Sequence, residues 1–197
     1  MNSNKFVKTV LVGTGTLLIL AGGMTAVIDP FFHYHKPLKQ LEYPLERGKE
    51  RYLNNGIIQN FDYDAAITGT SMMQNFKTSQ FDDLFGTHSV KVTLTGDTYW
   101  AIDEEIRTIF DNKSDIKYIF RCLDYNKIFD DKSDYNYNNV PTYLYDNNIW
   151  NDVQYLFNKD IFIDNTLGVI KYTLHGEKTP SMDAVSYTHL RAHETAA

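Results

Sequence analysis

The segment YDAAITGTSMMQNF, residues 63–76, decides the fold class of this 197-residue chain. Its short, small-and-apolar run, residues 63–68, suits a strand, and Gly69, Thr70 and Ser71 end it as a turn. A second apolar run, 90–95, leads to Gly96 and a helical segment, and a third occupies 116–123. Strand, turn and helix repeated at this spacing predict parallel βαβ units, and therefore an α/β fold with an open parallel sheet.

Polar residues follow each of the three predicted strands. They are Ser71 after the first, Gly96 and Asp97 after the second, and Asp124 after the third. In open parallel sheets the ligand crevice lies outside the carboxyl ends of the strands. We therefore expect these residues along one rim, with Ser71 at the start of a helix whose free N–H groups could stabilise an oxyanion. A simple helix cap is the structural alternative for Ser71.

The N-terminal part contains an uncharged run, TVLVGTGTLLILAGGMTAVI, at residues 9–28. About 20 residues are what a helix needs to cross ~30 Å of hydrocarbon. Lys5 and Lys8 precede the run and Asp29 follows it, so the positive-inside bias predicts a cytoplasmic stub and transmembrane anchor over 1–28. Everything after it would be extracytoplasmic at the cell membrane. A cleaved signal peptide is the alternative, disfavoured by the length of the run.

Residues 29–60 are predicted to be a membrane-proximal segment. Its aromatic cluster FFHYH, residues 31–35, is typical of headgroup-level anchors. Residues 44–60 predict a charged stalk or first surface helix, and the amphipathic region 149–172 predicts helices that could cover the sheet. The α/β domain itself is expected over 61–184.

Composition limits the possible partners. The chain has 25 acidic and 19 basic residues, a net charge of −6, and no basic cluster, which disfavours nucleic acid. Its one cysteine, Cys122, excludes a disulfide framework and a thiolate metal site built from this chain alone. We expect neither a metal nor a cofactor.

The segment VSYTHLRAHET, residues 185–195, has no apolar period. It resembles the conceptual translation of a transposase-based sequencing adapter. This resemblance implies that residues 185–197 are an artefact and that the domain over 61–184 is incomplete.

Four stretches carry a resemblance to a known family: DAAITGTSMMQNFKTSQFDDLFG (64–86), TLTGDTYW (93–100), IKYIFRCLDYN (116–126) and PTYLYDNNIWNDVQYLFN (141–158). They resemble the membrane-anchored SGNH/GDSL-like hydrolases of bacterial cell surfaces, distant relatives of proteins that assist acylation of teichoic acids and exopolysaccharides. The resemblance implies a three-layer, flavodoxin-like sheet domain.

The resemblance also implies site roles. Ser71 matches the nucleophile, within Gly-Thr-Ser where the family usually has Gly-Asp-Ser, and Gly96 matches the glycine that gives an N–H to the oxyanion hole. Asp124 stands where the family has an asparagine. An ionised carboxylate there would repel an oxyanion, so Asp124 is held protonated, or Asn126 reaches in, or the hole is built differently.

These residues leave two main functions open. The first is a serine esterase or acyltransferase acting on acyl esters of a cell-surface glycan or teichoic acid. No Asp-x-x-His block follows, so the general base is expected in a missing C-terminal portion, and this chain by itself is expected to be inactive. The second is a non-catalytic accessory that binds a surface polymer or a membrane-bound acyltransferase. A surface domain without a ligand is a third reading.

Overall fold

The structure, a computed structural model, describes residues 3–44, 48–130, 140–146 and 148–176. Segment 185–197, which resembles an adapter, lies outside the described residues, as does much of the polar connection between 125 and 148. Statements below concern the described residues.

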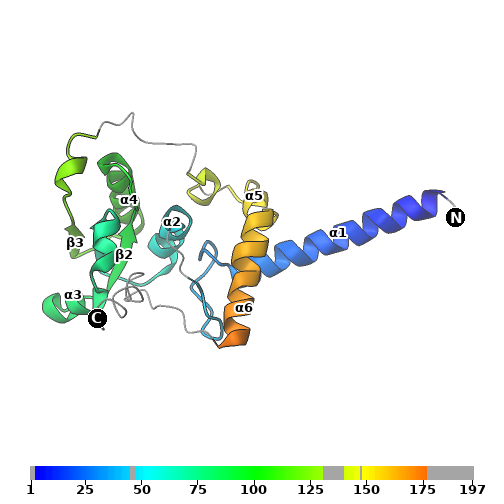
Figure 1. Cartoon of the computed structure of the whole chain (residues 1–197), viewed down its shortest axis with the longest axis horizontal. Helices are drawn as coiled ribbons and strands as arrows, with labels where there is room; N and C mark the ends of the chain where they lie inside the picture. The colour runs from blue at the N-terminus through cyan, green and yellow to red at the C-terminus, as the bar shows by residue number, and fades with distance from the viewer. Residues whose placement is uncertain (1–2, 45–47, 131–139, 147, 177–197) are drawn as a thin grey trace, which may run out of the picture.

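A three-stranded parallel sheet forms one end of the molecule (Figure 1). Its strands are β1 (Ala65–Gly69), β2 (Ser89–Thr93) and β3 (Tyr118–Arg121), in the order β2-β1-β3. Both neighbours run parallel to β1, with Ala66 opposite Val90 on one side and Ile119 on the other. The prediction of an α/β chain with an open parallel sheet is confirmed.

Helices cover both faces of this sheet, so β1 is buried throughout its length. One face packs its side chains, such as Ala66 and Val92, into a core with α2 (Glu50–Asn60) and α4 (Tyr99–Asn112). The other face packs Ala65 and Ile67 against η1 (Ser71–Asn75), a short 3-10 helix, and α3 (Thr78–Phe85). Because successive side chains of β1 point to opposite faces of the sheet, this strand contributes to two separate cores.

The prediction of a stalk or surface helix at 44–60 is wrong, because α2 is a core helix. Its apolar residues Leu53, Ile57 and Ile58 are buried, as expected, but so are Asn54 and Asn55. Their amides are satisfied internally: Asn54 Nδ2 donates to Thr93 O at 3.1 Å, and Asn55 Nδ2 donates to Leu144 O. Buried amides with such partners are tolerated in a core, and a polarity pattern cannot anticipate the partners.

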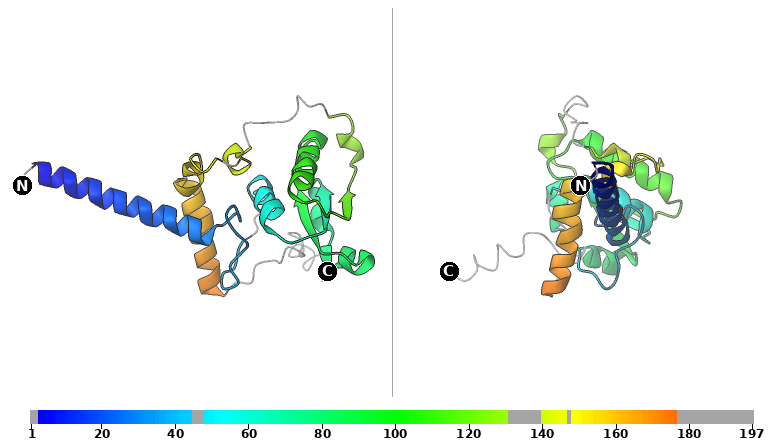
Figure 2. Two further views of the ribbon diagram at one scale, coloured as in Figure 1. Left: turned by 180° about the vertical axis from the view of Figure 1, so that it is seen from behind. Right: turned by 90° about the vertical axis from the view of Figure 1, so that its right-hand side faces the viewer.

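The long N-terminal helix α1 (Ser3–Ile28) projects from the opposite end of the molecule to the sheet (Figures 1 and 2). It is the one described helix long and apolar enough to cross a membrane. Its first turns stand free, whereas Gly22, Thr25 and Ile28 are buried in the body.

Short helices surround the base of α1. They are α5 (Val153–Leu156), the π-helical η6 (Ile161–Thr166) and α6 (Leu167–His175), and α1 contacts the first two of them. A Cβ on Gly22 would lie 2.9 Å from the Phe157 ring, so α1 packs closely there. The prediction that 149–172 covers the sheet is therefore wrong, since these helices pack around α1 instead.

Asp29 turns the chain back into the body directly after α1. Its buried carboxylate accepts the N–H groups of His33 at 2.9 Å, Tyr34 at 2.7 Å and His35 at 3.0 Å, and the Tyr155 hydroxyl at 2.7 Å. Residues 31–35 therefore wrap around the carboxylate, and the side chains of residues 31 and 32 are only 3% and 2% exposed. The prediction of headgroup anchors is wrong for these two rings, because they pack in the core.

Candidate functional site at the strand ends

The turn after β1 depends on Gly69. Its φ of +145° is a conformation that favours glycine. A Cβ at this position would also lie 2.6 Å from Met73 Cγ and 3.1 Å from Cys122 Cβ. Glycine therefore lets η1 fold tightly onto the end of β1 and lets the end of β3 approach it, which sets the position of Ser71.

Ser71 is half-buried at the first residue of η1, at the carboxyl edge of the sheet. Next to it, Thr70 Oγ1 donates to Asp124 Oδ2, after β3. On the same 3-10 helix, Gln74 Nε2 donates to Thr95 Oγ1 at 2.8 Å, after β2. The three segments predicted to share a rim therefore meet around the helix that carries Ser71.

The helix at Ser71 differs from the prediction. Because η1 has five residues and 3-10 geometry, it provides little of the dipole expected at the start of an α-helix. Thr70 occupies the cap position without capping, because its hydroxyl goes to Asp124. Oxyanion stabilisation here would depend on individual N–H groups.

Gly96 lies in the tight turn after β2, with φ +70°. Its carbonyl accepts Lys127 Nζ at 3.4 Å, whereas its N–H hydrogen-bonds no other described residue. The same is true of the Ser71 N–H. Asp97, next in the turn, pairs with Arg51 and accepts the Thr98 N–H at 3.1 Å, and Thr98 caps α4. These contacts thus hold the turn in place, while the Gly96 N–H has no hydrogen-bond partner among the described residues.

Asp124 acts as a hydrogen-bond acceptor. One carboxylate oxygen accepts from Thr70, the other lies 3.8 Å from Cys122 Sγ, and the main-chain oxygen accepts the Tyr99 hydroxyl at 2.8 Å. Burial, with Asp124 nearby, raises the pKa of the Cys122 thiol, which keeps the sulfur protonated. The backbone of Asn126 belongs to η2 (Tyr125–Lys127), but its side chain lies outside the described part of the structure.

Histidines are far from this edge in the part of the chain that the structure describes. His88 lies at the amino edge of the sheet, just before β2, and its N–H donates to Asp64 Oδ1 at 2.7 Å. His33 and His35 lie at the base of α1, and His175 ends α6. No described group of three or more metal-ligating side chains could hold an ion.

A cavity of about 880 Å³ opens beside the end of β2. It lies between this strand end, the start of α2 and the segments around residues 127 and 143. Charged and aromatic side chains line it, including Arg51, Asp97, Lys127 and Tyr143. Of the predicted site residues, Gly96 lines the cavity, whereas Ser71 and Asp124 do not. No local pattern in the sequence pointed to Arg51 or Tyr143, which come from segments far from the strand ends in the chain.

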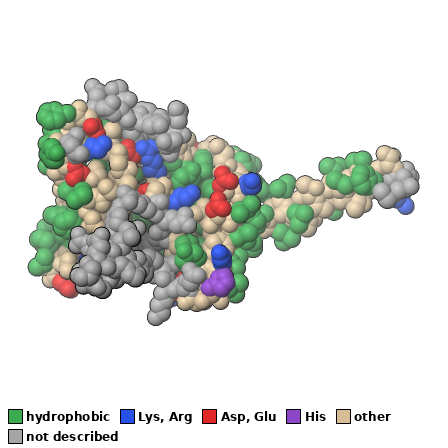
Figure 3. Space-filling model, viewed as in Figure 1, with side chains coloured by type: hydrophobic (Ala, Val, Ile, Leu, Met, Phe, Trp, Pro, Cys, Tyr) green, Lys and Arg blue, Asp and Glu red, His purple; other side chains and the backbone are tan. Residues whose placement is uncertain are grey.

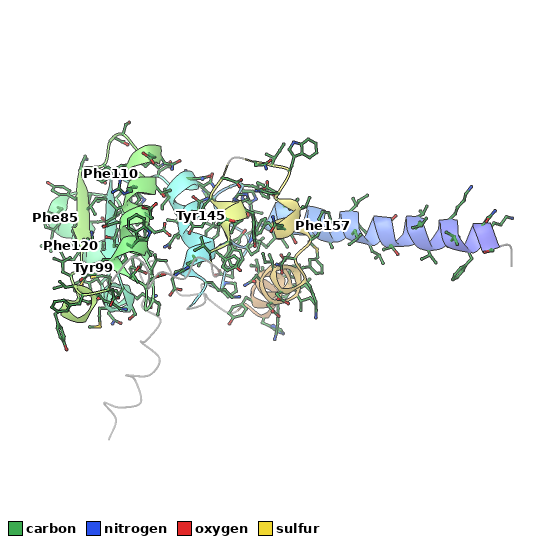
Figure 4. All side chains as sticks on the ribbon, turned by 90° about the horizontal axis from the view of Figure 1, so that it is seen from above. Phe85, Tyr99, Phe110, Phe120, Tyr145 and Phe157 are labelled. Atoms are coloured by element: carbon green, nitrogen blue, oxygen red, sulfur yellow. The ribbon has the colours of Figure 1, made fainter. Side chains whose placement is uncertain are left out.

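Glu105 is buried near this cavity, on α4 beside Asn54 and Tyr145 (Figure 4 labels Tyr145). The Tyr145 hydroxyl lies 2.6 Å from Arg51 O and 3.0 Å from Glu105 Oε1, so its single proton can be donated to either oxygen. Burial raises the pKa of Glu105 from 4.5 to about 7, and the hydrogen bonds oppose only part of that shift.

This raised pKa predicts a specific pH dependence of stability. The folded state holds the Glu105 proton up to about pH 7, whereas the unfolded chain releases it near pH 4.5, so stability falls as the pH rises through this window. Glu105→Gln keeps an acceptor for Tyr145 and removes the titration. Between pH 5 and pH 8 we expect the wild type to lose about 2 to 3 kcal/mol relative to this variant in urea unfolding. Parallel pH profiles for the two proteins would contradict the assignment.

No family model, curated protein or solved structure matches this chain. The class is therefore defined by the structure itself: a mixed α/β chain with an open three-stranded parallel sheet and one long apolar N-terminal helix.

Proposed function

We propose that the chain is part of a membrane-anchored, extracytoplasmic SGNH-like serine esterase or acyltransferase that acts on acyl esters of cell-surface glycans or teichoic acid. One observation carries the proposal: η1, which holds Ser71, contacts the segments after β2 and β3 through Gln74–Thr95 and Thr70–Asp124. The serine, the Gly96 turn and Asp124 thus belong to one edge, where α/β sheets bind ligands.

In this proposal the Ser71 hydroxyl attacks the acyl carbonyl, and its proton passes to a general base. The N–H groups of Ser71 and Gly96 stabilise the oxyanion, since neither is committed to another described residue. Collapse of the intermediate breaks the ester C–O bond, releases the protonated alcohol and leaves the acyl group on Ser71. Water or a glycan hydroxyl then accepts the acyl group. The base comes from outside the described residues, since no described histidine lies at this edge.

The anchor in this proposal is α1, with the cytoplasmic end at Lys5 and Lys8 and the sheet domain outside the cell. Its length and apolar character support the span. The charge asymmetry around the run supports the orientation.

The test uses the product of the complete gene in membrane vesicles, with p-nitrophenyl acetate as the probe. Ser71→Ala is expected to reduce acetate release to the rate without enzyme, while the free energy of unfolding changes by less than about 1 kcal/mol. The matched control is Ser114→Ala, because Ser114 is exposed near the amino end of β3, away from the proposed site. Full activity in Ser71→Ala would remove Ser71 from the mechanism.

A second candidate, favoured by the acceptor role of Asp124, is a non-catalytic accessory. Here the edge and the adjoining cavity bind a surface polymer or a membrane-bound acyltransferase without chemistry. The wild-type gene product would then release no acetate from the probe, yet would bind an O-acetylated oligosaccharide in a pull-down, and Arg51→Ala in the cavity wall would weaken that binding.

A further inference from the structure

The end of the body around α1 carries several large apolar side chains that are exposed. We call this surface the basal face and define it by Ile149, Trp150, Val153, Phe157, Ile163 and Leu167, each at least 37% exposed. Phe157 contacts Gly22 of α1, so the face begins where α1 leaves the body (Figure 4). Figure 3 shows hydrophobic side chains bordering the base of α1.

The length of α1 indicates what lies against this face. The uncharged run from Thr9 to Ile28 is long enough for the ~30 Å hydrocarbon layer. Gly22, Thr25 and Ile28 in this run, however, are buried against the body. At ~1.5 Å per residue, the free part from Thr9 to Ala21 covers only ~20 Å. A bilayer that contains the whole run must therefore reach up to the basal face.

The orientation of the helices agrees with this requirement. In Figure 1, α6 runs roughly across the direction of α1, and the view along α1 in Figure 2 (right) shows the two side by side. A helix that crosses a membrane along its normal would therefore place α6 in the membrane plane. Leu167, the first residue of α6, is 37% exposed, and the exposed Lys171 follows one turn later, while the exposed Ile163 lies in the preceding η6. Such a helix suits the headgroup region.

We propose that the basal face rests in the outer boundary of a phospholipid bilayer, with Trp150 at headgroup depth. This inference depends on α1 spanning the membrane, as in the proposed function, but not on any chemistry at Ser71. The free part of α1 alone is about 10 Å shorter than the hydrocarbon layer is thick, and the apolar basal face supplies the remaining depth. The contact also holds the sheet at the end of the molecule away from the bilayer (Figure 1).

The test measures the depth of Trp150 by fluorescence in phosphatidylcholine vesicles. The chain has two tryptophans, so Trp100→Phe leaves Trp150 as the only reporter. The matched control adds Trp150→Phe and Tyr125→Trp, because Tyr125 is 83% exposed and Trp150 is 82% exposed. Lipids brominated at carbons 6 and 7 are expected to quench Trp150 at least twofold and the control site hardly at all. Iodide is expected to quench Trp150 several-fold less than the control site.

A third variant, Leu18→Trp with Trp100→Phe and Trp150→Phe, reports whether α1 is inserted. Quenching of the Leu18 site by lipid bromine together with full iodide access to Trp150 overturns the basal-face inference and leaves the anchor intact. An unquenched Leu18 site together with an exposed Trp150 overturns both. Lipid quenching at both the Leu18 site and Trp150 supports the basal face, and lipid quenching at Trp150 with an unquenched Leu18 site overturns the inference, because the inference requires an inserted α1.

Discussion

Gly56→Ala is expected to lower the free energy of unfolding by more than about 3 kcal/mol, because it places a methyl group inside packed backbone. A Cβ at Gly56 of α2 would overlap Phe31 O and would lie 2.5 Å from Phe32 O. These carbonyls cannot easily move, since both rings are buried and Asn60 Nδ2 donates to Phe32 O at 2.7 Å. Urea unfolding of the detergent-solubilised protein measures the loss.

The matched control is Gly168→Ala. Gly168 lies in α6, and a Cβ there would meet nothing within 4 Å. Alanine is the better helix former, so this variant is expected to be as stable as the wild type or up to about 1 kcal/mol more stable. Equal stability of Gly56→Ala and Gly168→Ala would show that the segment after α1 does not pack against α2 as described.

Asp29→Ala is expected to cost about 4 kcal/mol of unfolding free energy. The substitution leaves three N–H groups and the Tyr155 hydroxyl without their acceptor, and an unsatisfied buried donor costs about 1 to 3 kcal/mol. Burial and the Asp29 carboxylate hold the pKa of Tyr155 well above its usual value, so its hydroxyl remains a donor. Thermal or urea unfolding measures the effect.

Two further variants separate the contributions at Asp29. Tyr155→Phe removes one donor and keeps the carboxylate, so it should destabilise the protein much less than Asp29→Ala. Asp62→Ala removes an exposed carboxylate that pairs with Lys36 at the surface, and it should leave the unfolding midpoint unchanged. If Asp29→Ala unfolds at the wild-type midpoint, the turn after α1 does not depend on its carboxylate.

The sheet could be predicted because its strands carry local signals. Buried parallel strands need short apolar runs, and their turns need residues such as Gly69 and Gly96, so β1, β2 and the helix α4 all follow from the order of residues. The same order predicted that Ser71, Gly96 and Asp124 share an edge, since parallel strands place their carboxyl ends together. The hydroxyl-to-carboxylate bond between Thr70 and Asp124 was not predictable, because it depends on how closely β1 and β3 approach.

The segment after α1 shows the opposite case. An aromatic cluster next to an apolar helix predicts anchors at the membrane, yet Phe31 and Phe32 are buried. Their burial depends on Asp29, which is satisfied in part by Tyr155, 126 residues away in the chain. An aromatic residue that does border α1 in space, Phe157, comes from a distant segment instead.

The amino-acid sequence by itself determined the apolar N-terminal helix, the parallel strands and the common edge of their turns, because hydrophobic period and turn residues act over a few neighbours. The tertiary structure alone decided that α2 is a core helix, that 149–172 packs on α1, and that the cavity lies beside Gly96 rather than at Ser71. Each of these outcomes depends on contacts between residues far apart in the chain. The free energies of such contacts cannot be predicted from the pattern of neighbouring residues.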